Sequence, residues 1–98
     1  MKHDNKEIED QFVSLCAWPN AERFFVFDNP RYCALLKCHD KIYSLYIYDS
    51  ANYGGSAAFK VTRQGILGLH GNKAQVAEQK RFIAELLNSI SNQMITRG

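Results

Sequence analysis

The sequence has no hydrophobic run long enough to cross a bilayer. Runs of aromatic and aliphatic residues such as Phe24-Phe25-Val26-Phe27 are short, whereas a membrane-spanning helix needs roughly 20 apolar residues. The first ten residues, MKHDNKEIED, are too polar and too acidic for a secretory signal peptide, which needs a basic start and an apolar stretch. We therefore expect a cytoplasmic protein without a membrane partner.

Cysteine and proline are both scarce. The three cysteines, an odd number without the dense spacing of a disulfide framework, are expected to be reduced thiols. Two prolines and 46% hydrophobic residues are typical of a folded globule rather than a disordered chain. A length of 98 residues accommodates one domain, residues 1–98, which excludes multidomain enzymes and large barrels.

Two segments have helical periodicity. Apolar residues at helical spacing predict a first helix over about residues 5–17, ended by Trp18-Pro19. A longer apolar stripe predicts a second helix over about residues 73–94, capped by Asn72 and Gln75. At 1.5 Å per residue this helix is roughly 33 Å long, and a short strand is roughly 20 Å. We therefore expect its last turn to extend past the sheet.

The residues between the helices predict four or five antiparallel strands. The first strand is apolar from Phe24 to Phe27, which suggests burial on both faces. Closing the next hairpin around His39-Asp40, or with a four-residue loop, pairs residues whose numbers sum to 79. The predicted strands are residues 23–27, 31–37, 42–48, 57–62 and 66–69.

This order of elements predicts an α+β fold, in which a single-layer antiparallel sheet is flanked by an N-terminal and a long C-terminal helix. Alternation places Tyr43, Leu45 and Ile47 on one face of the sheet and Tyr46 and Tyr48 on the other. If both helices cover the first face, the two tyrosines face outward. If one helix covers each face, they lie only at the edge. The sequence leaves both arrangements open.

Cys33, Cys38 and His39 could be considered as zinc ligands. However, Cys33 and Cys38 are five positions apart along a strand, so they point to opposite faces. A nucleophilic pair of Cys38 and His39 lacks a third group to orient it. We predict no metal site and no cofactor.

Asp28, Arg31 and Asp49 are expected to meet at one end of the sheet. Two carboxyl groups can perform acid–base catalysis if their surroundings give them different pKa values, so that one is protonated while the other is ionised. An arginine between aspartates is more often an ordinary surface ion pair. We therefore predict no catalytic residue.

Positive charge is concentrated in the second half of the chain. The formal net charge is only +2, but no acidic residue occurs from Ser50 through Ala77. A basic patch in residues 60–81 could bind nucleic acid or another polyanion, although ordinary solvated charge explains the same residues. Its candidate residues are Lys60, Arg63, Lys73, Lys80 and Arg81.

Aromatic residues are abundant, with six Phe, five Tyr and one Trp. Tyrosines on an uncovered sheet face are typical of protein interfaces, because each offers a large area, few rotatable bonds and one hydroxyl. The candidate partner-binding residues are Leu35, Tyr46, Tyr48 and Tyr53, with Lys60 and Arg63 at the rim.

The main hypothesis is a small non-enzymatic binding protein that acts by protein–protein contact, such as a stoichiometric inhibitor, an immunity protein or an anti-defence protein. Binding of nucleic acid or another polyanion through the basic patch, with Lys73, Lys80 and Arg81 on the helix, is the alternative. A homodimer through Ile90 and Met94 of the C-terminal helix is compatible with either hypothesis.

Overall fold

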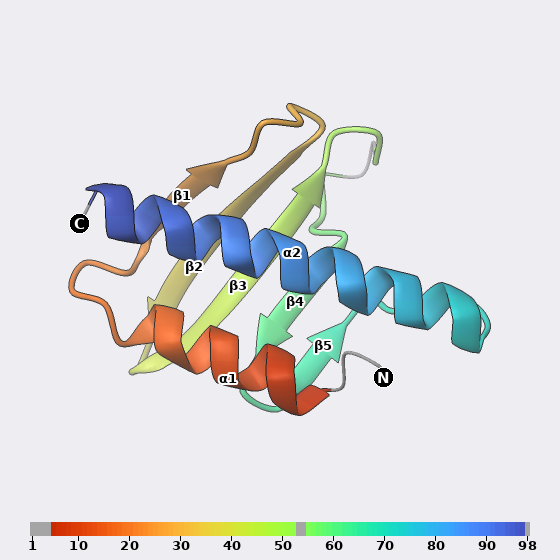
Figure 1. Cartoon of the computed structure of the whole chain (residues 1–98), viewed down its shortest axis with the longest axis horizontal. Helices are drawn as coiled ribbons and strands as arrows, with labels where there is room; N and C mark the ends of the chain where they lie inside the picture. Colours follow the sequence, from red (N-terminus) through yellow and green to blue (C-terminus); the bar gives the residue numbers. More distant parts are fainter. Residues whose placement is uncertain (1–4, 53–54, 98) are drawn as a thin grey trace.

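A computed structural model describes residues 5–52 and 55–97. Its five strands form one antiparallel sheet in which each strand pairs with its neighbours in the chain (Figure 1). This confirms the predicted α+β fold, including the fifth strand. The elements are α1 (Asn5–Cys16), β1 (Arg23–Val26), β2 (Tyr32–His39), β3 (Ile42–Asp49), β4 (Phe59–Thr62), β5 (Gly65–Leu67) and α2 (Lys73–Arg97).

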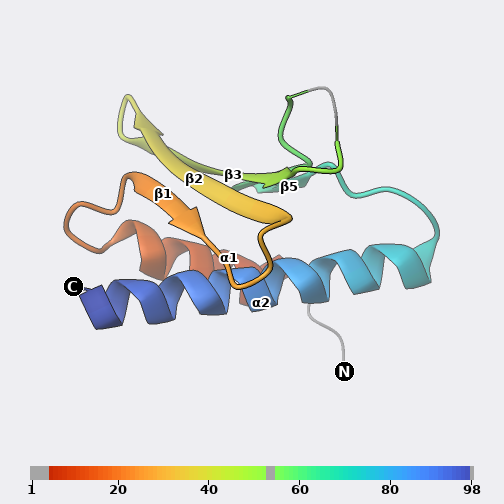
Figure 2. The same ribbon diagram turned by 90° about the horizontal axis from the view of Figure 1, so that it is seen from above.

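Both helices lie on the same face of the sheet, as Figure 2 shows. They contact each other, and α1 also contacts β4. Of the two arrangements that the sequence leaves open, the structure therefore has the one in which Tyr46 and Tyr48 face away from the helices. We call the helix side the covered face and the opposite side the open face.

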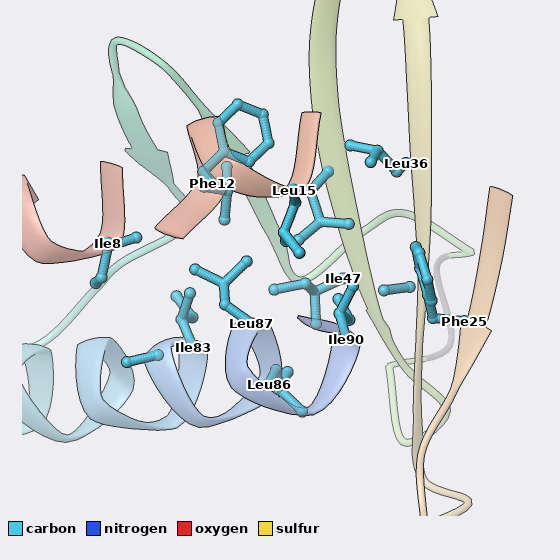
Figure 3. Packing of buried hydrophobic residues seen from close by; sticks show 14 of the residues in the cluster. Ile8, Phe12, Leu15, Phe25, Leu36, Ile47, Ile83, Leu86, Leu87 and Ile90 are labelled. Atoms are coloured by element: carbon cyan, nitrogen blue, oxygen red, sulfur yellow. The ribbon is translucent and has the colours of Figure 1, made fainter. Parts of the chain in front are cut away.

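The hydrophobic core lies between the covered face and the two helices (Figure 3). Strand alternation directs every second side chain of the sheet into it. Each fully buried aliphatic or aromatic side chain contributes about 1.5–3 kcal/mol relative to an exposed one. The core residues are Ile8, Phe12, Leu15 and Ala21; Phe25, Ala34, Leu36, Leu45, Ile47 and Val61 of the sheet; and Ile83, Ala84, Leu86, Leu87, Ile90 and Met94 of α2.

The β2–β3 hairpin closes around Asp40-Lys41, so the predicted register was wrong. His39 pairs with Ile42, and paired residue numbers sum to 81. Asp40 and Lys41 have φ values of 52° and 66°, and two positive φ values fit a two-residue turn that follows the strand twist. The two registers differ by an even number of residues, so every side chain keeps its predicted face.

Strand β1 is not buried on both faces, which corrects the interpretation of its apolar run. It is an edge strand that pairs only with β2. Phe25 is buried in the core, but Phe24 and Val26 are 56% and 60% exposed. The helices cover only one face, so alternate residues of this strand remain in solvent.

Helix α2 begins with the predicted cap. The Gln75 N–H donates to Asn72 Oδ1 at 2.9 Å, and the Asn72 N–H donates to Gln75 Oε1 at 2.8 Å. These reciprocal bonds satisfy N–H groups that the first turn leaves without helical partners. The prediction that this segment is a long capped helix is confirmed.

The first turns of α2 extend past the sheet, an overhang that was predicted only for its last turn, where Ile95 is 64% exposed. No residue from 73 to 82 is buried, whereas buried residues recur from Ile83 to Met94. Ile90 and Met94 are both 0% exposed. They are core residues beneath the sheet, so these two side chains are not accessible to a second copy of the chain.

Strands β4 and β5 are shorter than predicted. Gly68 follows β5 with φ +107°, and a Cβ at this position would overlap with the carbonyl oxygen of Ala58. Glycine therefore ends β5 where the chain passes closely beside the residue before β4.

Within the described residues, neither helix has the combination of length and apolar character that a membrane span requires.

Candidate functional site

A row of paired residues crosses the whole open face. Phe24 of β1 pairs with Leu35, Leu35 with Tyr46, Tyr46 with Lys60, and Lys60 with Leu67 of β5. We call these five residues the central row. Directly paired side chains on one face of a sheet lie close enough to contact each other. The central row therefore joins all five strands into one surface.

A second, shorter row lies beside the first. Val26 pairs with Cys33, and Cys33 pairs with Tyr48. Tyr46 and Tyr48 alternate along β3, so they belong to neighbouring rows of the same face. The predicted contact residues Leu35, Tyr46 and Tyr48 are thus brought together at the centre of the open face.

Most of the exposed large hydrophobic residues are on this face. Six such residues stand out among the described residues, and four of them are Phe24, Val26, Ile42 and Leu67. Ile42 and Leu67 are 65% and 63% exposed. Single exposed apolar residues are ordinary, whereas a large exposed apolar patch on one face is typical of an interaction site. The other two are Val13 and Ile95, on the helices.

The open face is hollowed at its centre. A shallow depression of about 490 Å³ is lined by residues of β2, β3 and β4, among them Leu35, Ile42, Tyr46 and Tyr48. The ammonium group of Lys60 lies 5.4 Å from the centroid of the Tyr46 ring, within the range of a cation–π interaction. The Lys60 side chain is therefore held against the Tyr46 ring within the central row.

Sequence reasoning missed four residues of this face as contact residues: Phe24, Val26, Ile42 and Leu67. The alternation signal was present, since Phe24 and Val26 flank Phe25 and Leu67 follows Ile66. It was overlooked in β1 because four consecutive apolar residues hide a period of two. In β5, three residues are too few for a period to be visible.

Among the predicted contact residues that the structure describes, Arg63 is not on the open face. Arg63 lies in the turn after β4 and lines a space beside α1 with Glu9 and Cys16. Its side chain therefore belongs to the helix side of the sheet rather than to the rim of the open face. Tyr53 lies outside the described residues.

The five candidate basic residues do not form one patch. Lys60 lies on the open face beside Tyr46. Lys73, Lys80 and Arg81 are on α2, which packs against the covered face (Figure 2). Lys60 is on the open face, whereas the three helical cations are on the first turns of α2, which extend past the sheet on its helix side (Figure 2).

The three thiols are divided between the two faces, as predicted for Cys33 and Cys38. Cys33 is in the second row of the open face, whereas Cys38 alternates with the buried Leu36 and lies near Cys16 and Tyr43. Burial, and next the neighbouring Cys38, raises the pKa of Cys16 to about 11. Because the thiolate is the reactive form, Cys16 is an unreactive thiol at neutral pH.

Arg31 and Asp49 form the predicted contact at the end of the sheet. The guanidinium donates two hydrogen bonds, from Nε to Oδ1 at 2.7 Å and from Nη2 to Oδ2 at 2.9 Å. These bonds, together with the Ala51 N–H, hold the pKa of Asp49 below its usual value. A carboxylate with a lowered pKa is a weak base at neutral pH. Asp28 is exposed and is not the partner of Arg31.

A cleft of about 630 Å³ lies beneath the first turns of α2. Its aromatic residues contact one another, with Phe82 centred 4.7 Å from Tyr32 and 6.5 Å from Phe59. Its polar groups are already partnered in part, because Gln79 forms hydrogen bonds with both the N–H and the C=O of His70.

No group of three or more His, Cys, Asp or Glu within residues 5–52 and 55–97 is arranged to hold a metal ion.

No family model, curated protein or solved structure matches the chain. A functional conclusion must therefore come from the geometry of the molecule itself. The open face, with its two rows of apolar and tyrosine side chains, is the surface on which such a conclusion can be based.

Proposed function

We propose that the chain is a non-enzymatic binding protein whose open face covers part of the surface of another protein. A stoichiometric inhibitor, an immunity protein and an anti-defence protein all act in this way. The observation that carries the proposal is the concentration of exposed Phe24, Val26, Ile42 and Leu67 around the central tyrosines on the one face that no helix covers.

The composition of this face supports a protein partner. An antiparallel sheet that only faces water has polar residues at its outward positions. Here the outward positions of β1 are Phe24 and Val26, and those of β3 include Tyr46 and Tyr48. Aromatic and aliphatic side chains at the centre of a face are typical of the part of an interface that contributes most binding energy.

The dimensions of the face fit a small interface. Five strands spaced by about 4.8 Å span roughly 24 Å, and the longest strands, of eight residues at about 3.3 Å each, are roughly 26 Å long. Strands β1, β4 and β5 have only four, four and three residues, so the flat area of the sheet is about 400 Å². A complex through this face is therefore at the low end of the size range of protein interfaces.

The test compares capture of partners from a native lysate by the wild-type chain and two open-face variants. Tyr46→Ala/Tyr48→Ala removes the central rings, and Phe24→Thr/Leu67→Thr removes apolar area from both ends of the central row while retaining strand propensity. We expect both variants to lose the proteins that the wild type retains in stoichiometric amounts, as measured by quantitative mass spectrometry. Circular dichroism checks that each variant is folded.

The matched control is Val13→Thr/Ile95→Thr, which removes the two exposed hydrophobic residues that lie on the helices. It changes a similar amount of exposed apolar area away from the open face, so capture should be unaffected. Equal capture by the wild type and both folded open-face variants contradicts the proposal.

A further inference from the structure

The charges on the open face are all of one sign. Lys37 and Lys60 are at its outward positions in β2 and β4, and His39 ends β2 on the same side. All residues of the five strands are described, and no Asp or Glu occupies an outward position on this face. The outward positions of the five strands therefore carry two ammonium groups and no carboxylate.

Three acidic residues at the ends of the strands border the face, and each has another partner. The Glu22 carboxylate accepts a hydrogen bond from the Cys38 N–H at 3.1 Å, and Asp49 is paired with Arg31. Asp40 is at the hairpin tip, 3.4 Å from His39 Nε2. None of these carboxylates is a partner of Lys37 or Lys60.

Lys60 is the cation that most needs a partner in a complex. It is half-buried in the central row, with its ammonium group over the Tyr46 ring. Covering this row removes water from the ammonium group, and a buried charge requires an opposite charge or hydrogen-bond acceptors. The chain supplies none on this face, so the partner must supply them.

A second copy of the chain does not meet this requirement. Two open faces packed against each other would place the lysines of one copy against a face whose charged strand residues are also lysines. Like charges in an interface are unfavourable and exclude partners rather than select them. The charge pattern therefore argues against a face-to-face homodimer.

Single-stranded nucleic acid offers phosphates but does not fit the remaining side chains. Proteins that bind it stack bases on free aromatic rings along a strongly basic groove. Here Lys60 occupies a face of the Tyr46 ring, and three of the four exposed large hydrophobic residues on this face are the aliphatic Val26, Ile42 and Leu67. The apolar area is suited to aliphatic and aromatic side chains of a protein.

We infer that the partner is a protein whose contact surface combines apolar residues at the centre with Asp or Glu side chains opposite Lys37 and Lys60. This inference rests on the proposed function and specifies the chemistry of the partner. The apolar residues provide area, and the pairing of ammonium and carboxylate groups fixes the orientation of the partner on the face.

The test combines charge reversal with cross-linking of the complexes formed in a native lysate. Lys37→Glu/Lys60→Glu reverses the charge of the open face, and Lys73→Glu/Lys80→Glu makes the same net change on α2. We expect the first variant to retain about 10-fold less of the captured protein or still less, and the second to retain the wild-type amount. A carbodiimide, which joins an amine directly to a carboxyl group, should couple Lys37 or Lys60 to Asp or Glu of the captured protein.

Five other results overturn the inference, and they have distinct consequences. Cross-links between isotopically labelled and unlabelled copies of the chain identify a homodimer. Loss of capture after nuclease treatment identifies nucleic acid as the partner. Loss of capture in Lys73→Glu/Lys80→Glu shows that the partner recognises the positive charge of α2 instead of the open face. Loss in Tyr46→Ala/Tyr48→Ala with no change in Lys37→Glu/Lys60→Glu rejects the acidic partner but retains the proposed function. Unchanged capture in both of these variants rejects the proposed function itself.

Discussion

The two faces of the sheet are made by the same five strands, yet they differ in what their side chains do. On the covered face the central residues are small or aliphatic and fully buried, such as Ala34, Leu36, Leu45 and Ile47. On the open face, large apolar residues alternate with tyrosine and lysine and remain accessible. Folding needs only the first face to be apolar. The apolar character of the second face is therefore not explained by folding, and binding gives it a reason.

The largest difference between the faces is expected in stability. Leu45→Ala removes a fully buried side chain from the covered face and should lower the free energy of unfolding by about 2–5 kcal/mol, because it leaves a cavity. Leu67→Ala on the open face should change it by no more than about 0.5 kcal/mol, as is usual for exposed residues. Urea denaturation followed by circular dichroism measures both values. Similar losses of stability at the two positions would show that the Leu67 side chain contributes to folding as a core residue does.

A change at the end of β5 should disturb the open face through the backbone. Gly68→Ala forces a side chain into a positive φ and against the Ala58 carbonyl group, and we expect a loss of about 1–3 kcal/mol. Gly65→Ala is the matched control, since Gly65 also has positive φ but has open space where the methyl group would lie. Thermal unfolding should rank Gly68→Ala as the more damaging substitution. The reverse order would mean that the contact with Ala58 does not hold β5 in place.

The smallest effect concerns the pH dependence of stability on the covered side. The pKa of Cys16 is raised from 9.0 to about 11 in the folded chain, so the folded state keeps its thiol proton where the unfolded state releases it. Stability from this group is complete below pH 9 and is lost between pH 9 and 11. Because Cys16 is partly exposed, the loss should be only about 1 kcal/mol.

Denaturation at a series of alkaline pH values measures this loss. Cys16→Ala should remove the contribution and flatten the decline relative to wild type. Cys33→Ala, on the open face, retains Cys16 and should therefore retain the decline. A decline that persists unchanged in Cys16→Ala would assign it to other groups.

Local sequence patterns predicted the elements well where one signal dominated. The Asn72–Gln75 cap and the apolar stripe after it define a helix by local hydrogen bonding and periodicity. The residues of the β2–β3 hairpin were assigned to the correct faces although the turn was placed one residue too early. Side chains alternate between the faces, so a register shift of two residues leaves each of them on the same face. Strand β1 was misjudged, since a run of apolar residues does not indicate how many faces will be covered.

The sequence by itself determined the order of the elements, the cap of α2 and which residues of β2 and β3 share a face, because each depends on neighbours along the chain. Only the tertiary structure decided that both helices pack on one face, which makes Ile90 and Met94 core residues and leaves Tyr46 and Tyr48 accessible. It also decided that Phe24 and Leu67, far apart in the chain, end the same row. These outcomes depend on which surfaces the helices bury together, and that choice is made by the packing of the whole core rather than by any local pattern.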